Sequence, residues 1–305
     1  MENQDAFSGF HPLVNFLYFT IVLLCSMFFL HPVCIGISLI CAFVYSIYLN
    51  GRKAVRFNFL GLLPLMAVTA LLNPAFNHAG ETLLAYLPSG NPLTLESIAY
   101  GAAAAAMLAS VICWFSCYNA VMTSDKFVYL FGRVIPAMSL VLSMTLRFVP
   151  KFRAQIQTVS RAQRCVGRDV ADGSVLQRAK HGLTILSIML TWVLENAIET
   201  ADSMKSRGYG LPGRTAFSIY RFDRRDRTAL IWLLACGGYL LAGKALGGID
   251  WRYFPSIRGT AAQPLSLSVY AAYLALCLLP VIVDAAADRK WAAIRAAENK
   301  GGNCR

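Results

Sequence analysis

Charged residues are scarce in this sequence. Asp, Glu, Lys and Arg make up 14% of its 305 residues, whereas 57% are hydrophobic and the mean hydropathy is +0.52. Soluble domains carry about 25% charged residues, so the composition predicts an integral membrane protein. Acidic residues are rarer than basic ones, 16 against 28, so the net charge is +12. Because the basic residues cluster beside apolar runs, we expect them to meet phospholipid headgroups and an acidic partner protein, and not nucleic acid.

Several motifs that carry chemistry are missing from the sequence. Its nine cysteines form no Cys-x-x-Cys pair and its four histidines lie in four separate segments, so neither a disulfide framework nor a zinc site is indicated. No glycine-rich loop of the Walker type is present, and no apolar run contains the acid and base pair of a proton relay. No Lys or Arg precedes the first apolar run, which argues against a cleavable signal peptide. We therefore expect this chain to bind no cofactor and no metal.

Long apolar runs dominate what is present. The first two are just long enough to cross the roughly 30 Å hydrocarbon core of a bilayer as helices. The pattern predicts an all-α membrane protein with about six transmembrane helices, organised as a four-span region (1–120), a coupling region (121–227) and two further spans with a tail (228–305). The six runs are residues 13–30, 33–49, 57–72, 95–118, 229–246 and 265–283.

The distribution of basic residues predicts the orientation of these spans. Residues 50–56 contain Arg52, Lys53 and Arg56, whereas residues 73–93 contain no Lys or Arg. Residues 121–227 hold 17 Lys and Arg residues against 8 Asp and Glu residues. By the positive-inside rule, the two basic segments and both termini are expected on the cytoplasmic side.

Two apolar pieces within the basic segment are poor candidates for spans. Val134 to Val149 is bounded by prolines and holds an arginine, and Leu183 to Leu194 is only 12 residues long. We interpret both as halves of long helices whose continuations enter water, since a proline such as Pro150 can kink a helix without ending it. The second helix is expected to stop at Arg207 and Gly208. The local pattern alone favours an ordinary helix C-cap for that arginine, and its expected position at the cytoplasmic tip of the helix favours a contact point for a partner.

Glu195, Glu199 and Asp202 form the sequence's one cluster of several acids. Their spacing places them on one helix face, where a charged, solvated face is the simpler interpretation. The alternative is a membrane-embedded, lipid-processing enzyme that uses these acids together with nearby arginines for a phosphate. A permease that carries substrate by itself is disfavoured by the lack of polar groups at mid-membrane.

Taken together, the motifs resemble the transmembrane T component of energy-coupling factor transporters, bacterial vitamin and metal-ion importers related to ABC systems. The likeness covers most of the chain. Two of these motifs are helix-ending signatures. The one at Ser206-Arg207-Gly208 matches the family's small-Arg-Gly pattern closely, whereas the earlier one, at Ala162–Asp169, has Val166 where the pattern expects arginine. The motifs that carry the resemblance are Leu72–Gly80 (LNPAFNHAG), Phe127–Arg133 (FVYLFGR), Arg147–Pro150 (RFVP), Ala162–Asp169 (AQRCVGRD), and Ser206-Arg207-Gly208 followed by Tyr209-Gly210 and Gly213-Arg214-Thr215.

The resemblance implies a non-catalytic subunit of the bacterial inner membrane, in which two long coupling helices cross. Each helix would end in a motif that docks on one of two ATPases, which bind ATP and Mg²⁺, while the apolar halves hold a small membrane subunit that binds the substrate. Ser206, Arg207 and Gly208 are thus expected to contact one ATPase. The other would meet the first signature, where Arg164 or Arg168 takes over the missing charge. The remaining residues assigned by the resemblance are Cys165, Val166 and Gly167 for that ATPase, and Leu183, Leu186, Leu190, Met138 and Leu142 for the substrate-binding subunit.

Overall fold

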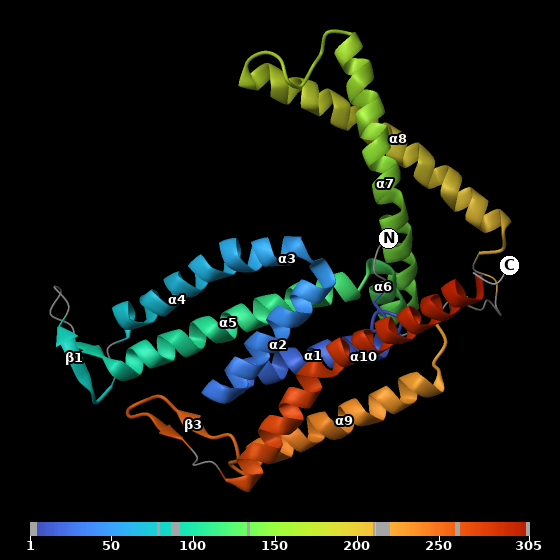
Figure 1. Ribbon diagram of the computed structural model, residues 1–305. Coiled ribbons are helices and arrows are strands. Elements are labelled where there is room, and N and C mark those ends of the chain that lie inside the picture. The colour runs from blue at the N-terminus through green and yellow to red at the C-terminus, as the bar shows by residue number, and fades with distance from the viewer. Residues whose placement is uncertain are drawn as a thin grey trace. The chain divides into compact units, whose positions relative to one another are not determined.

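The computed structural model describes residues 5–77, 80–86, 92–132, 135–209, 211, 220–259 and 263–302 (Figure 1). Motif residues His78, Ala79, Arg133, Gly210 and 213–215 lie outside this part, as does the side chain of Met138. The described part is helical apart from two short antiparallel hairpins, β1 with β2 and β3 with β4. Its elements are α1 Pro12–Phe28, α2 Pro32–Asn50, α3 Arg52–Phe57, the π-helix η1 Asn58–Leu62, α4 Leu63–Phe76, β1 Leu83–Tyr86, β2 Pro92–Thr94, α5 Leu95–Val121, α6 Ser124–Gly132, α7 Pro136–Cys165, α8 Val175–Ser206, α9 Arg224–Ala245, β3 Trp251–Arg252, β4 Arg258–Gly259 and α10 Pro264–Gly302.

The described helices include six segments long and apolar enough to cross a membrane: α2, the continuous stretch Ala54–Phe76, α5, α8, α9 and α10. The prediction of an all-α membrane protein with six such helices is confirmed. The membership of the set differs from the expected one. Helix α1 is apolar but only 17 residues long, because the chain turns at His31-Pro32. Helix α8 qualifies because one 18-residue window of it, which extends beyond its 12-residue apolar piece, still has a mean hydropathy of 1.3.

The chain divides into two compact units. One combines Met1–Thr123 with Tyr220–Arg305, and the other is Ser124–Ile219, which holds α6, α7 and α8. The first unit contains five of the six membrane-capable segments. The second contains both helix-ending signatures, so the candidate site belongs to this unit alone.

The core of the first unit is built from aromatic rings and a buried chain of hydroxyl groups. Trp114 of α5 is fully buried, with its ring centroid 6.2 Å from that of Tyr18 on α1. Its Nε1 donates a hydrogen bond of 3.0 Å to Ser38 Oγ on α2, which lies 2.7 Å from Ser26 Oγ and 3.2 Å from Ser110 Oγ. Buried polar groups in apolar helices need such partners. The network therefore fixes how α1, α2 and α5 pack.

His31 caps the start of α2. Its Nδ1 accepts a hydrogen bond of 3.3 Å from the Val33 amide, and its Nε2 lies 2.9 Å from the Tyr270 hydroxyl. The Trp251 ring packs edge-on against the imidazole at 5.0 Å. Since Nδ1 accepts, the neutral imidazole carries its proton on Nε2. Burial lowers the pKa of His31 below its ordinary value, because desolvation disfavours the charged ring.

The second unit consists of two long helices that follow α6. Helix α7 has 30 residues and α8 has 32, so both continue well beyond their apolar halves, as the sequence predicts. Pro150 lies inside α7 without ending it. Helix α8 begins with a capping box, in which the Ser174 hydroxyl accepts from the Gln177 amide and the Gln177 side chain accepts from the Ser174 amide.

Candidate functional site

The candidate site starts from the crossing of α7 and α8, which Figure 1 shows in green and yellow. Val159 of α7 packs against Ile185 and Met189 of α8, and these three side chains are 9%, 9% and 6% exposed. Phe152 of α7 adds an edge-to-face contact with Trp192 of α8 at 5.7 Å. Burial of this kind is the main stabilising term between amphipathic helices. The helices therefore meet at a small apolar core and are otherwise largely exposed.

A polar contact reinforces the crossing about two helical turns from this core. Lys151 Nζ donates a hydrogen bond of 2.6 Å to Asn196 Oδ1 and lies 5.3 Å from the centre of the Trp192 ring. Asn196 Nδ2 in turn donates to the Trp192 carbonyl at 3.0 Å. An ammonium held by an amide oxygen and an aromatic face is directional, unlike apolar packing. The pair thus sets the register of the crossing.

The end of α7 is a Schellman motif. Val166 is the C-cap residue, and Gly167 follows with φ +77°, a left-handed conformation that favours glycine. The Gly167 amide donates to the Arg164 carbonyl at 3.0 Å, and the Arg168 amide donates to the Gln163 carbonyl at 2.9 Å. These two bonds satisfy carbonyls that a helix end otherwise leaves unpaired.

The end of α8 repeats this geometry residue for residue. Arg207 is the C-cap, and Gly208 has φ +78°. The Gly208 amide donates to the Lys205 carbonyl at 3.0 Å, and the Tyr209 amide donates to the Met204 carbonyl at 3.0 Å. Val166 therefore occupies the backbone position of Arg207, and Arg168 occupies that of Tyr209. The two signatures share a backbone and differ in where the arginine stands on it.

The arginines at the two ends have different surroundings. Arg207 is exposed, and its guanidinium makes no hydrogen bond or ion pair with another described residue. Arg164 Nε lies 2.9 Å from Asp169 Oδ2, with 76% of the arginine side chain exposed. Arg168 is exposed, and Val166 is 69% exposed. An exposed ion pair is worth about 0–1 kcal/mol, so Asp169 partly neutralises Arg164 without locking it.

The apolar residues assigned to a membrane partner lie on the face of α8 opposite the crossing. Leu183, Leu186 and Leu190 are 65%, 54% and 55% exposed, and their spacing of three and four residues forms one stripe. In the sequence these leucines alternate with Ile185 and Met189, which face α7. Leu142 of α7 is half-buried. The sequence reasoning missed the crossing residues, although the second stripe formed by Ile185 and Met189 is a signal for them.

The acidic cluster does not gain a catalytic setting in the structure. Glu195, Glu199 and Asp202 are all exposed on α8. Within the described part of the chain, no group of three or more His, Cys, Asp or Glu residues is arranged to hold a metal ion. These acids therefore form a solvated face of α8.

Comparisons with known proteins find a family model and several relatives for this chain. The family model described as Cobalt transport protein (CbiQ) matches residues 10–217. The energy-coupling factor transporter transmembrane protein EcfT of Lactobacillus helveticus (strain DPC 4571) is 35% identical over 108 residues, which cover 35% of this chain and 39% of that protein. The protein of the same name from Lacticaseibacillus paracasei is 35% identical over 112 residues, covering 36% of this chain and 42% of the relative.

A third relative, EcfT of Bacillus selenitireducens, is 30% identical over 112 residues. The matched segments thus span less than half the length of these curated relatives. The family model, in contrast, covers more than half of this chain and includes both helix ends. The resemblance inferred from the motifs is therefore confirmed, and the chain belongs to the cobalt transport protein (CbiQ) family.

Proposed function

We propose that this chain is the non-catalytic, energy-coupling membrane subunit of an importer of the energy-coupling factor type. The observation that carries the proposal is the pair of long helices that cross at one small core and end in two identical Schellman motifs. ATP and Mg²⁺ would bind to partner ATPases and not to this chain. The transported substrate would be a vitamin or a metal ion, selected by another polypeptide.

The helices suit the transmission of a displacement. At about 1.5 Å per residue, α7 and α8 are roughly 45 Å long, and each is held to the other near one crossing. A force applied at the end of α7 therefore moves its apolar half, residues 136–149, on the other side of the crossing, whereas the apolar half of α8 lies at the crossing and moves with it. Arg207 offers a permanently charged, planar fork of donors, which pairs bidentately with carboxylates in a groove. Gly208 allows the partner's backbone to come close. Ser206 precedes both residues, and its hydroxyl donates a hydrogen bond of 2.9 Å to the Ser203 carbonyl.

The exposed leucine stripe is the proposed contact for the substrate-binding subunit. Leu183, Leu186 and Leu190 are each more than half exposed, and Leu142 and Met138 of α7 are proposed as further contacts for that subunit. Apolar stripes of this kind on a helix are recognised by a groove or helix face of a partner. Movement of α8 would then tilt or release the bound subunit.

The first signature is proposed to contact a second ATPase. Val166 stands where Arg207 stands in the other helix, so the charge must come from Arg164 or Arg168. Cys165 and Gly167 complete the surface around them. Because Asp169 pairs with Arg164, Arg168 is the stronger candidate. Alanine at Arg164 and at Arg168, tested separately by pull-down of the ATPases, should weaken assembly in at least one variant. Undiminished assembly in both would exclude the hypothesis.

Copurification tests the proposal as a whole. The tagged chain, purified in mild detergent from its native host, should bring down two ATPase subunits and one small hydrophobic protein, whose masses identify them. The rival function is a membrane-embedded, lipid-processing enzyme that uses Glu195, Glu199 and Asp202. Such an enzyme works alone, so a chain that purifies without ATPases and turns over phospholipid would overturn the proposal.

The proposed location is the bacterial inner membrane, in contact with its lipids and with both termini in the cytoplasm. Among the cysteines that the structure describes, Cys165 is the exposed one, so it reports the side on which the helix ends lie. In a Cys304→Ser background, a membrane-impermeant maleimide should label Cys165 in inside-out vesicles and not in right-side-out vesicles. Adding Cys165→Ser should abolish the signal, and the reverse labelling pattern would refute the orientation.

A further inference from the structure

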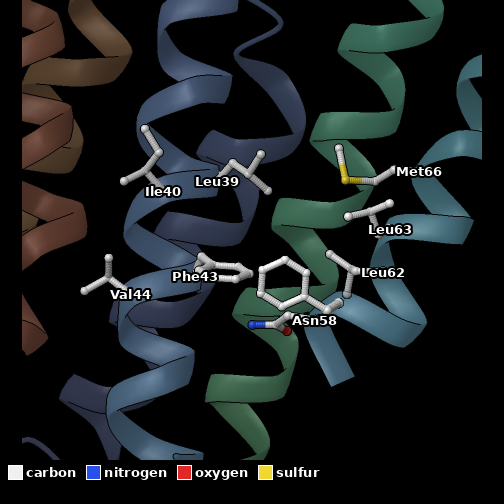
Figure 2. Close-up of a pocket in the computed structure, with 9 residues that line it drawn as sticks. Leu39, Ile40, Phe43, Val44, Asn58, Leu62, Leu63 and Met66 are labelled. Carbon is white, nitrogen blue, oxygen red and sulfur yellow. The ribbon is translucent and has the colours of Figure 1, made fainter. Parts of the chain in front are cut away.

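An apolar groove opens in the first unit between α2 and the segment formed by η1 and α4 (Figure 2). It encloses about 280 Å³, and Asn58 is its polar lining residue. The described residues that line it include no charged one, so the groove offers packing surface and no group that selects a particular ligand. Buried charges that hold another part of the chain lie elsewhere in this unit, around the segment before α1.

That segment, Phe7–His11, is held at both ends by buried carboxylates. The Phe7 amide donates a hydrogen bond of 2.7 Å to Asp284 Oδ1 on α10. The His11 amide donates a hydrogen bond of 3.1 Å to Asp226 Oδ1 on α9. Asp284 and Asp226 are 2% and 3% exposed. Because hydrogen bonds to an ionised carboxylate are roughly twice as strong as neutral ones, the segment ties the start of α9 firmly to α10.

Asp226 also holds the stretch through which the chain returns from the second unit. That stretch begins at Tyr220, where the first unit resumes. Asp226 Oδ2 accepts a hydrogen bond of 3.1 Å from the Asp223 amide, and the Phe222 ring packs edge-on against the His11 imidazole at 5.2 Å. One carboxylate oxygen therefore binds the N-terminal segment and the other binds the returning chain. An asparagine side chain has a single acceptor oxygen and cannot make both contacts.

Arg225 adds a third contact from the first turn of α9. Its Nη2 donates a hydrogen bond of 3.3 Å to the Gly9 carbonyl, and its Cζ lies 4.2 Å from the centre of the Phe10 ring, where a cation is attracted to the aromatic face. Phe7 is 1% exposed, and its ring packs edge-on against that of Tyr18 on α1 at 5.1 Å. The segment is thus anchored in the core on one side and bonded to the start of α9 on the other.

Asp226 and Asp284 are costly groups to bury. Within the described part of the chain neither forms an ion pair with Lys or Arg, and Asp284 Oδ2 has no hydrogen-bond partner there. Taking a carboxylate out of water without a cation to pair with it lowers stability, and apolar packing alone would join two helices without that loss. Departures of this kind from stable packing are expected at functional positions.

We propose that Phe7–His11 is a clamp that keeps the start of α9 stationary while the second unit moves, with Arg225 and Asp226 as positioning residues. This inference rests on the proposed function, in which a partner ATPase displaces α8 at Arg207. The chain continues from α8 into α9, so a displacement of α8 also acts on α9. If α9 moved with α8, the displacement would be lost within the first unit. A clamped α9 provides the fixed point against which the leucine stripe of α8 moves.

Hydrogen exchange in the assembled complex tests the clamp. The full-length chain with its copurified ATPases and hydrophobic subunit is placed in nanodiscs, and amide exchange is followed by mass spectrometry with and without MgATP. In the wild type, peptides covering Phe7–His11 and the first turn of α9 should be equally protected in both conditions. Asp226→Asn should raise exchange in these peptides about tenfold during ATP turnover, as expected for the loss of one hydrogen bond to a charged group.

Arg225→Ala tests the function of the clamp at an exposed position, where the variant is expected to fold. The measurement is the fraction of the hydrophobic subunit released on addition of MgATP, by native mass spectrometry. Arg225→Ala should lower that fraction about threefold, with ATPase assembly and the thermal unfolding midpoint unchanged. Arg225→Lys should restore part of the release, because an ammonium also binds an aromatic face.

Arg224→Ala is the matched control. It removes the same charge from the same turn of α9, and in the described structure Arg224 makes no side-chain contact with Phe7–His11, so release should match the wild type. A wild-type chain that copurifies without ATPases would overturn the proposed function and the clamp together. With assembly intact, the clamp alone would be overturned by unchanged release in Arg225→Ala, an equal loss in Arg224→Ala, unchanged exchange in Asp226→Asn, or MgATP-dependent exchange at Phe7–His11 in the wild type. A loss of release in Arg225→Ala that only follows a lower unfolding midpoint would also overturn it, because these contacts would then have a purely stabilising role.

Discussion

Replacing Arg207 with alanine is the most direct test of the coupling proposal. The substitution removes an exposed guanidinium and leaves the helix end intact, because the Schellman motif is made by backbone groups of Gly208 and Tyr209. Substitutions at exposed positions usually change the free energy of unfolding by less than about 0.5 kcal/mol. Any larger effect on assembly must therefore come from a partner. The thermal unfolding midpoint of the Arg207→Ala variant should match that of the wild type.

The expected loss of affinity follows from the chemistry of a docked guanidinium. Truncating one member of a buried, hydrogen-bonded charge pair at an interface costs about 2–5 kcal/mol, or roughly 30- to 5,000-fold in Kd. The measurement is binding of the purified ATPase subunits to the chain in nanodiscs, by biolayer interferometry, followed by transport and ATPase assays of the assembled complex. Arg207→Lys should restore only part of the affinity, since an ammonium cannot pair in a fork.

Lys205 provides the matched control for this experiment. It is exposed, lies in the same last turn of α8, and Lys205→Ala removes the same charge as Arg207→Ala. We expect Lys205→Ala to weaken ATPase binding by less than about threefold, because a rim charge acts mainly on the association rate. Equal losses in the two variants would mean that general electrostatic attraction, and not docking of Arg207, holds the partner. Wild-type binding and uptake by Arg207→Ala would contradict the mechanism itself.

Three further predictions concern the structure that supports the site. Met189→Ala should destabilise the second unit by about 2–5 kcal/mol, because it leaves a cavity in a crossing core with few buried residues. Leu190→Ala on the exposed face should lower the free energy of unfolding by less than about 0.5 kcal/mol. Chemical denaturation followed by tryptophan fluorescence measures both. Gly208→Ala should lower the stability of its helix end more than Gly167→Ala, because both glycines have φ near +78° but only the Cβ at position 208 meets a neighbour, Leu211 Cδ1 at 3.2 Å. Amide hydrogen exchange at the two helix ends compares the two losses. Stability in detergent should fall as the pH drops through about 6.5, because His31 binds a proton more readily in the unfolded chain, and His31→Asn, which keeps a capping oxygen, should remove that part of the thermal-melt pH dependence.

The positions of the membrane helices are largely predictable from the sequence. The expected runs at residues 33–49 and 95–118 correspond to α2, Pro32–Asn50, and α5, Leu95–Val121, because uninterrupted apolar length determines both. The start of α7 at Pro136 follows from proline's preference for the first helical turn. The prediction that a helix continues through Pro150 is confirmed. Local signals of this kind need no knowledge of distant contacts.

The crossing of α7 and α8 is harder to predict. Which face of α8 meets α7 depends on pairs such as Val159 with Met189, which are separated by a loop, and a single amphipathic pattern does not name its partner. The leucine stripe is the more conspicuous apolar face of α8, yet it is the exposed one. The contact between Lys151 and Asn196 is likewise invisible to hydropathy, since both residues are polar. The structure therefore adds the point at which α7 and α8 cross.

The two helix ends show what a shared backbone does and does not fix. Gly167 and Gly208 define the same motif, so side chains at matched positions project in the same way from each helix. A groove shaped for Arg207 receives a guanidinium from the C-cap position. Arg168 stands two residues further along, after the left-handed glycine has turned the chain away from the helix axis, so its guanidinium starts from a different point and direction. Under the proposed function, we therefore expect one groove geometry to accept the two arginines unequally, so that the two ATPase contacts are not equivalent.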